Sequence, residues 1–246
     1  MNNQSKFVAI SHKIGRKDER SRTMSRKGFT LQHRVIGVFA AWAVFFVGVV
    51  YAITLVLGIL SLKSSQDPIG DPFFSILELL IILMTSLMIL CMIVVHAYAP
   101  PEAKAYSFSA LVFMILLVGI TSCVHFVILT VSRQIEAAGL TWVPLFLSYK
   151  WPSVAYALDI LAWDFFFALS MLFAAPVFTG DRLEITVRIL MIVSGLLSLA
   201  GLIGVPLADM QIRMIGVLGY AGVAPIVFLL LGIVFGRTQQ VAGDIG

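Results

Sequence analysis

Charged residues are scarce in this chain. Only 12% of its 246 residues are Asp, Glu, Lys or Arg, whereas 60% are hydrophobic and the mean hydropathy is +1.00. A soluble globular domain carries about 25% charged residues, so this chain has too little polar surface to cover a globule in water. The composition excludes a soluble globular protein and predicts an integral membrane protein whose length suits one helical bundle.

Cysteine and the common cofactor and catalytic motifs are also missing. The two cysteines, Cys91 and Cys123, lie in apolar runs, which excludes a disulfide framework or a CxxC metal knuckle and favours small buried hydrophobic residues. HExxH, GxSG and GxxxxGK[ST] sequences do not occur. No predicted span holds a lysine that could anchor retinal, and His96 and His125 fall in opposite halves of their spans, which disfavours haem ligation. We therefore predict no cofactor, and an enzyme is the less favoured class.

Long apolar runs dominate the rest of the chain. Because lipid offers the backbone no hydrogen-bond partner, and no run alternates like a barrel strand, we expect these runs to be helical. The first is longer than the apolar core of a signal peptide, so we expect it to be retained. The fold class is therefore all-α, a polytopic membrane protein with six transmembrane helices in one bundle (residues 35–237). The predicted helices cover about 35–61, 73–97, 108–132, 154–178, 187–207 and 214–236.

Basic residues are concentrated before the first span. Nine of the 17 Lys and Arg lie in residues 1–34, which we predict to be a disordered cytoplasmic tail, and a short second tail covers 238–246. Placing both termini in the cytoplasm leaves thirteen basic residues inside and four outside, as the positive-inside rule requires.

The basic tail adjoins a membrane helix, so we expect its partner to be anionic lipid rather than nucleic acid. Each basic residue near the surface contributes roughly 1 kcal/mol of attraction to anionic headgroups; a pure orientation signal is the alternative. The expected lipid-binding residues are Arg16, Lys17, Arg20, Arg22, Arg26 and Lys27. The LFAAPVF segment, the charged turn after it and the glycine-rich final helices are similar to small bacterial membrane proteins. This resemblance implies a multi-pass protein of the bacterial inner membrane.

Two further regions have a recognisable pattern. An apolar stretch at 140–147, broken by Pro144 and too short to span, is followed by aromatic residues and is expected to lie in the outer interface. Small residues at three- and four-residue steps in the last two spans predict a closely packed hairpin. They are Ser194, Ser198 and Gly201 in the fifth span and Gly216, Gly219 and Gly222 in the sixth.

Four titratable residues from three consecutive spans fall in the outer half of the bundle. At about 1.5 Å rise per residue, Glu78, His125 and Asp159 lie roughly 7–10 Å deep and Asp164 about 15 Å deep. A buried carboxylate normally faces protein or water, so we expect them around a hydrated cavity that opens outward. Asp159 and Asp164 are about 140° apart on an α-helix, which prevents them from sharing a narrow stripe. Asp164 is expected to be neutral or paired with His125, and Trp163 to lie beside the cavity on the face of Asp159.

Three functions remain open on this pattern. A small proton- or cation-coupled transporter would use the acidic and histidine side chains as a relay or pocket. A non-catalytic membrane subunit or scaffold would use them to join helices or a partner protein. An intramembrane metal-dependent hydrolase would need a site built from Glu78, His125 and Asp159. A homodimer and a membrane partner protein are both open.

Overall fold

The computed structural model describes residues 29–64, 67–136 and 139–238. Within these ranges the chain forms helices, turns and loops and no strand. Six helices are long and apolar enough to cross a membrane. The predicted helical membrane bundle with six spans is therefore confirmed, and the chain fits a multi-pass integral membrane protein.

The six spans include short 3₁₀ and π-helical segments. The first three are α2 (Leu31–Leu60), α3 (Phe73–Tyr98), and η1 (Pro101–Ala103) with α4 (Lys104–Val127) and η2 (Ile128–Ser132). The fourth joins α7 (Val154–Ile160), η3 (Leu161–Phe166), α8 (Phe167–Ala174) and η4 (Ala175–Val177). The last two are α9 (Arg182–Gly201) with η5 (Leu202–Gly204), and α10 (Met210–Val217) with η6 (Leu218–Val223) and α11 (Ala224–Arg237).

Several spans begin earlier than the apolar runs indicate, because their first turns are polar and capped. The Asp181 carboxylate accepts the backbone N–H of Glu184 at 3.0 Å, so α9 starts at Arg182. Asp209 in the same way accepts the N–H of Gln211, so the sixth span starts at Met210. Such N-caps satisfy backbone donors that have no partner inside the helix.

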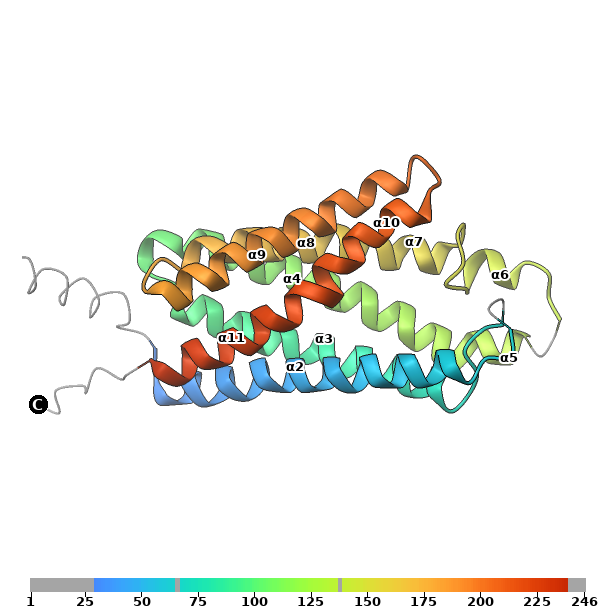
Figure 1. Ribbon diagram of the computed structural model, residues 1–246, viewed down its shortest axis with the longest axis horizontal. Helices are drawn as coiled ribbons and strands as arrows, with labels where there is room; N and C mark the ends of the chain where they lie inside the picture. Colours follow the sequence, from blue (N-terminus) through green and yellow to red (C-terminus); the bar gives the residue numbers. More distant parts are fainter. Residues whose placement is uncertain (1–28, 65–66, 137–138, 239–246) are drawn as a thin grey trace, which may run out of the picture.

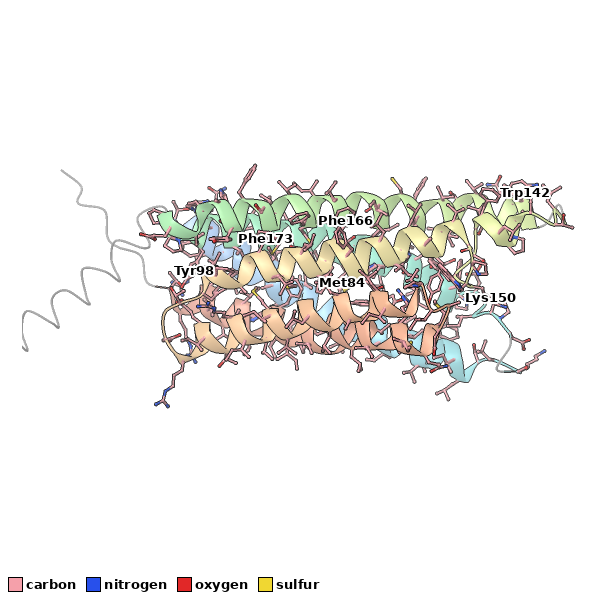
Figure 2. All side chains as sticks on the ribbon, turned by 90° about the horizontal axis from the view of Figure 1, so that it is seen from above. Met84, Tyr98, Trp142, Lys150, Phe166 and Phe173 are labelled. Carbon is pink, nitrogen blue, oxygen red and sulfur yellow. The ribbon has the colours of Figure 1, made fainter. Side chains whose placement is uncertain are left out.

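The spans form a closed ring of neighbours. Each packs against the span before it, and the last one returns to the first through the contact of α11 with α2. Short connections give this antiparallel arrangement directly. Helix α2 begins and α11 ends at one end of the bundle, which we call the termini end; the opposite end is the distal end (Figure 1). Tyr98 lies near the termini end, and Trp142 and Lys150 lie at the distal end (Figure 2).

The outside of the bundle is apolar. Phe39, Phe46 and Ile53 on α2 expose more than half of their side-chain surface, although they are large hydrophobic residues. Inside the ring, Phe167, Phe228 and other large apolar side chains are fully buried. An apolar exterior of this extent is what a lipid-facing surface requires.

The last two spans pack at van der Waals distance, as predicted. Ser194 Oγ donates to the carbonyl of Gly219 at 2.8 Å, and a Cβ on Gly219 would lie 2.6 Å from Ser194 O. Gly201 and Gly216 also face each other directly. Gly222 has nothing within 4 Å of where its Cβ would stand, so it takes no part in this contact.

Two short helices lie between the third and fourth spans. These are α5 (Arg133–Glu136) and α6 (Val143–Phe146), and both lie toward the distal end (Figure 1). Around α6, Trp142, Leu145 and Phe146 are exposed. Exposed aromatic and apolar residues just beyond a span are typical of the headgroup region.

Three spans contain a π-helical turn. They are η2, η3 and η6, in the third, fourth and sixth spans. A π-turn accommodates one extra residue and shifts the face that the following residues present; such turns are rare and frequently lie at functional sites. The same three spans, together with α3, carry the polar residues described next.

Candidate functional site

Five charged or titratable side chains form a chain across the distal half of the bundle. Each lies within 3.7 Å of the next, and acidic and basic groups alternate along the chain. All but Asp159 are at least nine-tenths buried. We call this set the charge chain; in order it consists of Glu78, His125, Asp159, Arg213 and Asp164.

The first link joins α3 to α4 and to the loop before α7. His125 Nδ1 lies 2.8 Å from Glu78 Oε2, and the Tyr149 hydroxyl lies 2.9 Å from the same nitrogen and donates to Glu78 Oε2 at 3.2 Å. Burial and the nearby carboxylates of Glu78 and Asp159 raise the pKa of Tyr149. Tyr149 therefore remains a neutral hydrogen-bond donor, and it fixes the loop over the Glu78–His125 pair.

The second link is the contact between His125 and Asp159. If Glu78 is the acceptor of this contact, His125 Nδ1 supplies its hydrogen. His125 Nε2, which has no hydrogen-bond partner among the described residues, points at Asp159 Oδ1 from 3.6 Å. If His125 carried a hydrogen on Nδ1 alone, its Nε2 would be a hydrogen-bond acceptor, and it would face a second acceptor, the Asp159 carboxylate. This contact is therefore complete only when a proton is present.

Arg213 lies between the two aspartates of the charge chain. Its Nε donates to Asp164 Oδ2 at 3.2 Å, and its Nη2 lies 3.7 Å from Asp159 Oδ2. Nη1 donates to the Tyr156 hydroxyl at 2.8 Å and Nη2 to the Tyr220 hydroxyl at 3.1 Å. The guanidinium carbon also lies 4.8 Å from the centroid of the Tyr156 ring, within the range of a cation–π contact. Acidic and aromatic groups thus enclose the guanidinium.

Asp164, the last member of the charge chain, lies at the contact between the last two spans. Asp164 is fully buried, and its Oδ1 has no hydrogen-bond partner among the described residues. A Cβ added to Gly216 would overlap this oxygen, and one added to Gly201 would lie 2.8 Å from it. The carboxylate therefore fits against two glycines, and no other residue type at either position leaves it that space.

The structure corrects two sequence-based expectations about Asp164. It pairs with Arg213 rather than with His125, because Arg213 lies inside the bundle and supplies a permanent positive charge. Asp159 and Asp164 also act on one partner instead of facing apart. Asp164 lies within the π-turn η3, whose i→i+5 hydrogen bonds bring residues five apart closer to one face.

The other predicted site residues lie as follows. Glu78, His125 and Asp159 come together in the first two links of the chain. Trp163 is buried, and its ring packs against Tyr220 at a centroid distance of 5.2 Å, behind the enclosure of the guanidinium. The predicted lipid-binding residues between Arg16 and Lys27 lie outside the described residues.

Sequence reasoning missed Arg213 and the three tyrosines around the chain. Arg213 directly precedes the apolar run 214–236 and is one of the four basic residues that the positive-inside rule places outside, so its sequence position indicates a boundary charge. A signal was available: Arg213, Gly216 and Tyr220 stand at i, i+3 and i+7, which places them on one helix face. Tyr149 and Tyr156 give no comparable pattern.

The described ranges also bear on metal binding and cavities. Within residues 29–64, 67–136 and 139–238, no group of three or more His, Cys, Asp and Glu side chains is arranged to hold a metal ion. Arg213 stands beside Asp159, where a metal bound by this carboxylate would have to compete with a fixed cation. A cavity of about 120 Å³ lies at the termini end, lined by Tyr98, Glu184 and Arg237 among others, and is separate from the charge chain.

Comparisons with protein-family models, with curated proteins and with solved structures find no match for this chain.

Proposed function

We propose that this protein is a small membrane transporter in which protons move along the charge chain. The observation that carries the proposal is the contact between His125 Nε2 and Asp159 Oδ1, two titratable groups 3.6 Å apart, in which the nitrogen has no hydrogen-bond partner among the described residues. Asp159 is also the most accessible member of the chain, with 16% of its side chain exposed. It is therefore the place where protons would enter from the distal side.

The charge balance of the chain supports the same proposal. Three carboxylates face one permanent cation, Arg213, and one histidine. Buried ion pairs in a bundle are favourable only when they are fully compensated. Gaining or losing a proton at His125 or Asp159 thus changes the energy of the whole chain. Acid and histidine chains behave in this way in pumps and transporters.

The setting of the chain follows from the distribution of basic residues. We infer that both termini are cytoplasmic and that the distal end is the outer side of a bacterial inner membrane, since the positive-inside rule assigns the basic tail to the cytoplasm. The tail (residues 1–34) then lies beside anionic lipid headgroups. The apolar exterior leaves room for a homodimer or a membrane partner, which cross-linking in native membranes would detect.

Proton flux into proteoliposomes tests the transport proposal. Purified protein is reconstituted with an entrapped pH-sensitive dye, and an inside-negative potential is imposed. Wild-type protein should acidify the lumen, and Asp159→Asn should reduce the flux to that of protein-free vesicles. Glu184→Gln is the matched control, because Glu184 is a buried carboxylate at the termini end and is not part of the chain. Equal flux in wild-type and Asp159→Asn vesicles would refute the proposal.

The scaffold role is the second candidate, and one observation favours it. Every member of the charge chain finds an oppositely charged neighbour within the molecule, so the chain joins α3, α4, α7, η3 and α10 without any ligand. If wild-type vesicles conduct no protons, and Asp159→Asn lowers the unfolding midpoint in detergent, the role of the charge chain is purely structural.

A further inference from the structure

We propose that the enclosure around Arg213 is a binding site for an organic cation of the guanidinium or primary ammonium class, with Arg213 as its internal occupant. This inference rests on the proposed transport function and names its substrate class. The cation would enter from the distal side, past the partly exposed Tyr156 and Asp159.

The enclosure has the chemistry that recognises organic cations. Its members are one aromatic face, two phenolic oxygens and two carboxylates, all directed at a single planar cation. Aromatic faces and carboxylates are the groups that bind guanidinium and ammonium ligands in proteins. These groups together satisfy N–H donors of the buried guanidinium, so the enclosure is shaped for a planar cation.

Asp164 contacts Arg213 more closely than Asp159 does. The Arg213 Nε–Asp164 contact is 3.2 Å, whereas the Arg213 Nη2–Asp159 contact of 3.7 Å is longer than a hydrogen bond. Asp159 is thus bound loosely on this side, and on its other side His125 Nε2 faces it without a hydrogen-bond partner. The carboxylate and the buried imidazole nitrogen thus face each other at 3.6 Å, beside the guanidinium.

Charge leaves room for that cation. If all three carboxylates are ionised and His125 is protonated, the charge chain has three negative and two positive groups, and with His125 neutral the imbalance is larger. One further positive charge at Asp159 balances the chain. A proton and an organic cation therefore compete for the same negative charge.

Thermal unfolding of the full chain in detergent tests the proposal. The probes are guanidinium chloride at about 10 mM, with urea as the neutral isostere and sodium chloride as the ionic control. Arg213→Ala removes the internal occupant, so guanidinium should raise its unfolding midpoint while urea and sodium chloride do not. Wild-type protein should need about tenfold more guanidinium for the same shift, since Arg213 competes for the site. No selective shift in Arg213→Ala would overturn the proposal.

A second arm covers the case in which Arg213→Ala does not fold. Guanidinium should then give a saturable shift in wild-type protein that is lost in Asp159→Asn, and the absence of such a shift refutes the proposal. The outcomes are distinguishable from those of the transport test. Proton flux without guanidinium binding would refute the cation site and leave the transport proposal standing. Guanidinium binding without proton flux would refute the transport proposal and leave the cation site standing.

Discussion

Gly216→Ala should destabilise the bundle through a side chain on another span. The new Cβ would overlap Asp164 Oδ1, and it would lie 3.3 Å from the Cα of Gly201. The backbone of α9 prevents the new Cβ from moving away from Asp164 on that side, so the Asp164 carboxylate has to move. Its Oδ2 then leaves Arg213 Nε, which it meets at 3.2 Å in the native arrangement.

The magnitude follows from the two contacts that are lost. Overpacking a tight contact costs about 1–3 kcal/mol, and breaking a buried ion pair on one side costs about 3–5 kcal/mol. Both describe one displacement, so the expected loss is about 3–5 kcal/mol rather than their sum. In an Asp164→Ala background the overlapping oxygen is absent, and Gly216→Ala should cost only about 1 kcal/mol from the remaining Gly201 contact. The coupling between the two positions is therefore about 2–4 kcal/mol.

Equilibrium unfolding in mixed micelles of the two single variants and the double variant measures this coupling. Gly222→Ala is the matched control, because nothing lies within 4 Å of its added Cβ. It should be neutral or stabilising by about 0.5–1 kcal/mol, as expected for Gly to Ala in a helix. Equal losses for Gly216→Ala in both backgrounds, or a midpoint equal to that of Gly222→Ala, would refute the reasoning.

Three further outcomes follow from single contacts. Arg213→Met leaves the Asp164 carboxylate buried without its partner and should lower the unfolding free energy by about 3–5 kcal/mol; an unchanged denaturation midpoint would contradict this. Because the raised pKa of Tyr149 makes the folded state hold the phenolic proton more tightly than the unfolded state, stability should fall above pH of about 10. Tyr149→Phe should weaken this alkaline loss in thermal scans from about pH 8 to pH 11, and parallel curves would argue against it. Ser194→Ala removes the hydrogen bond to Gly219 O and should cost about 0.6 kcal/mol, measurable against an exposed control such as Ser109→Ala.

The fold could be predicted from the sequence because one signal dominates it. Apolar runs of about 20 residues leave the backbone no alternative to a helix in lipid, and all six runs are helical in the structure. The helix starts were harder to predict. Hydropathy ignores polar first turns, so the capping role of Asp181 and Asp209 was invisible to it.

The candidate site shows where such reasoning stops. Depth along a helix can be counted, and it grouped Glu78, His125 and Asp159 correctly in space. The direction in which a side chain points depends on regular helical turns, and the π-turn η3 changes it for Asp164. No local sequence pattern indicates a π-turn, so the direction of the Asp164 side chain could not be predicted, although the position of Arg213 on the face of Gly216 and Tyr220 could.

One guanidinium links the two aspartates of the charge chain, and this gives the charge chain a physical means of transmission. Arg213 lies between Asp159, the most accessible member, and Asp164, which lies against the Gly201–Gly216 contact. When Asp159 is neutralised, Arg213 loses one of its two counter-charges and is drawn more strongly to the other. The carboxylate that receives this pull has no free space around it, so its displacement must be taken up by α9 and α10. We therefore expect proton binding at Asp159 to change the packing of the last two spans. Gly216→Ala should then alter the pH dependence of proton flux, even where the protein still folds.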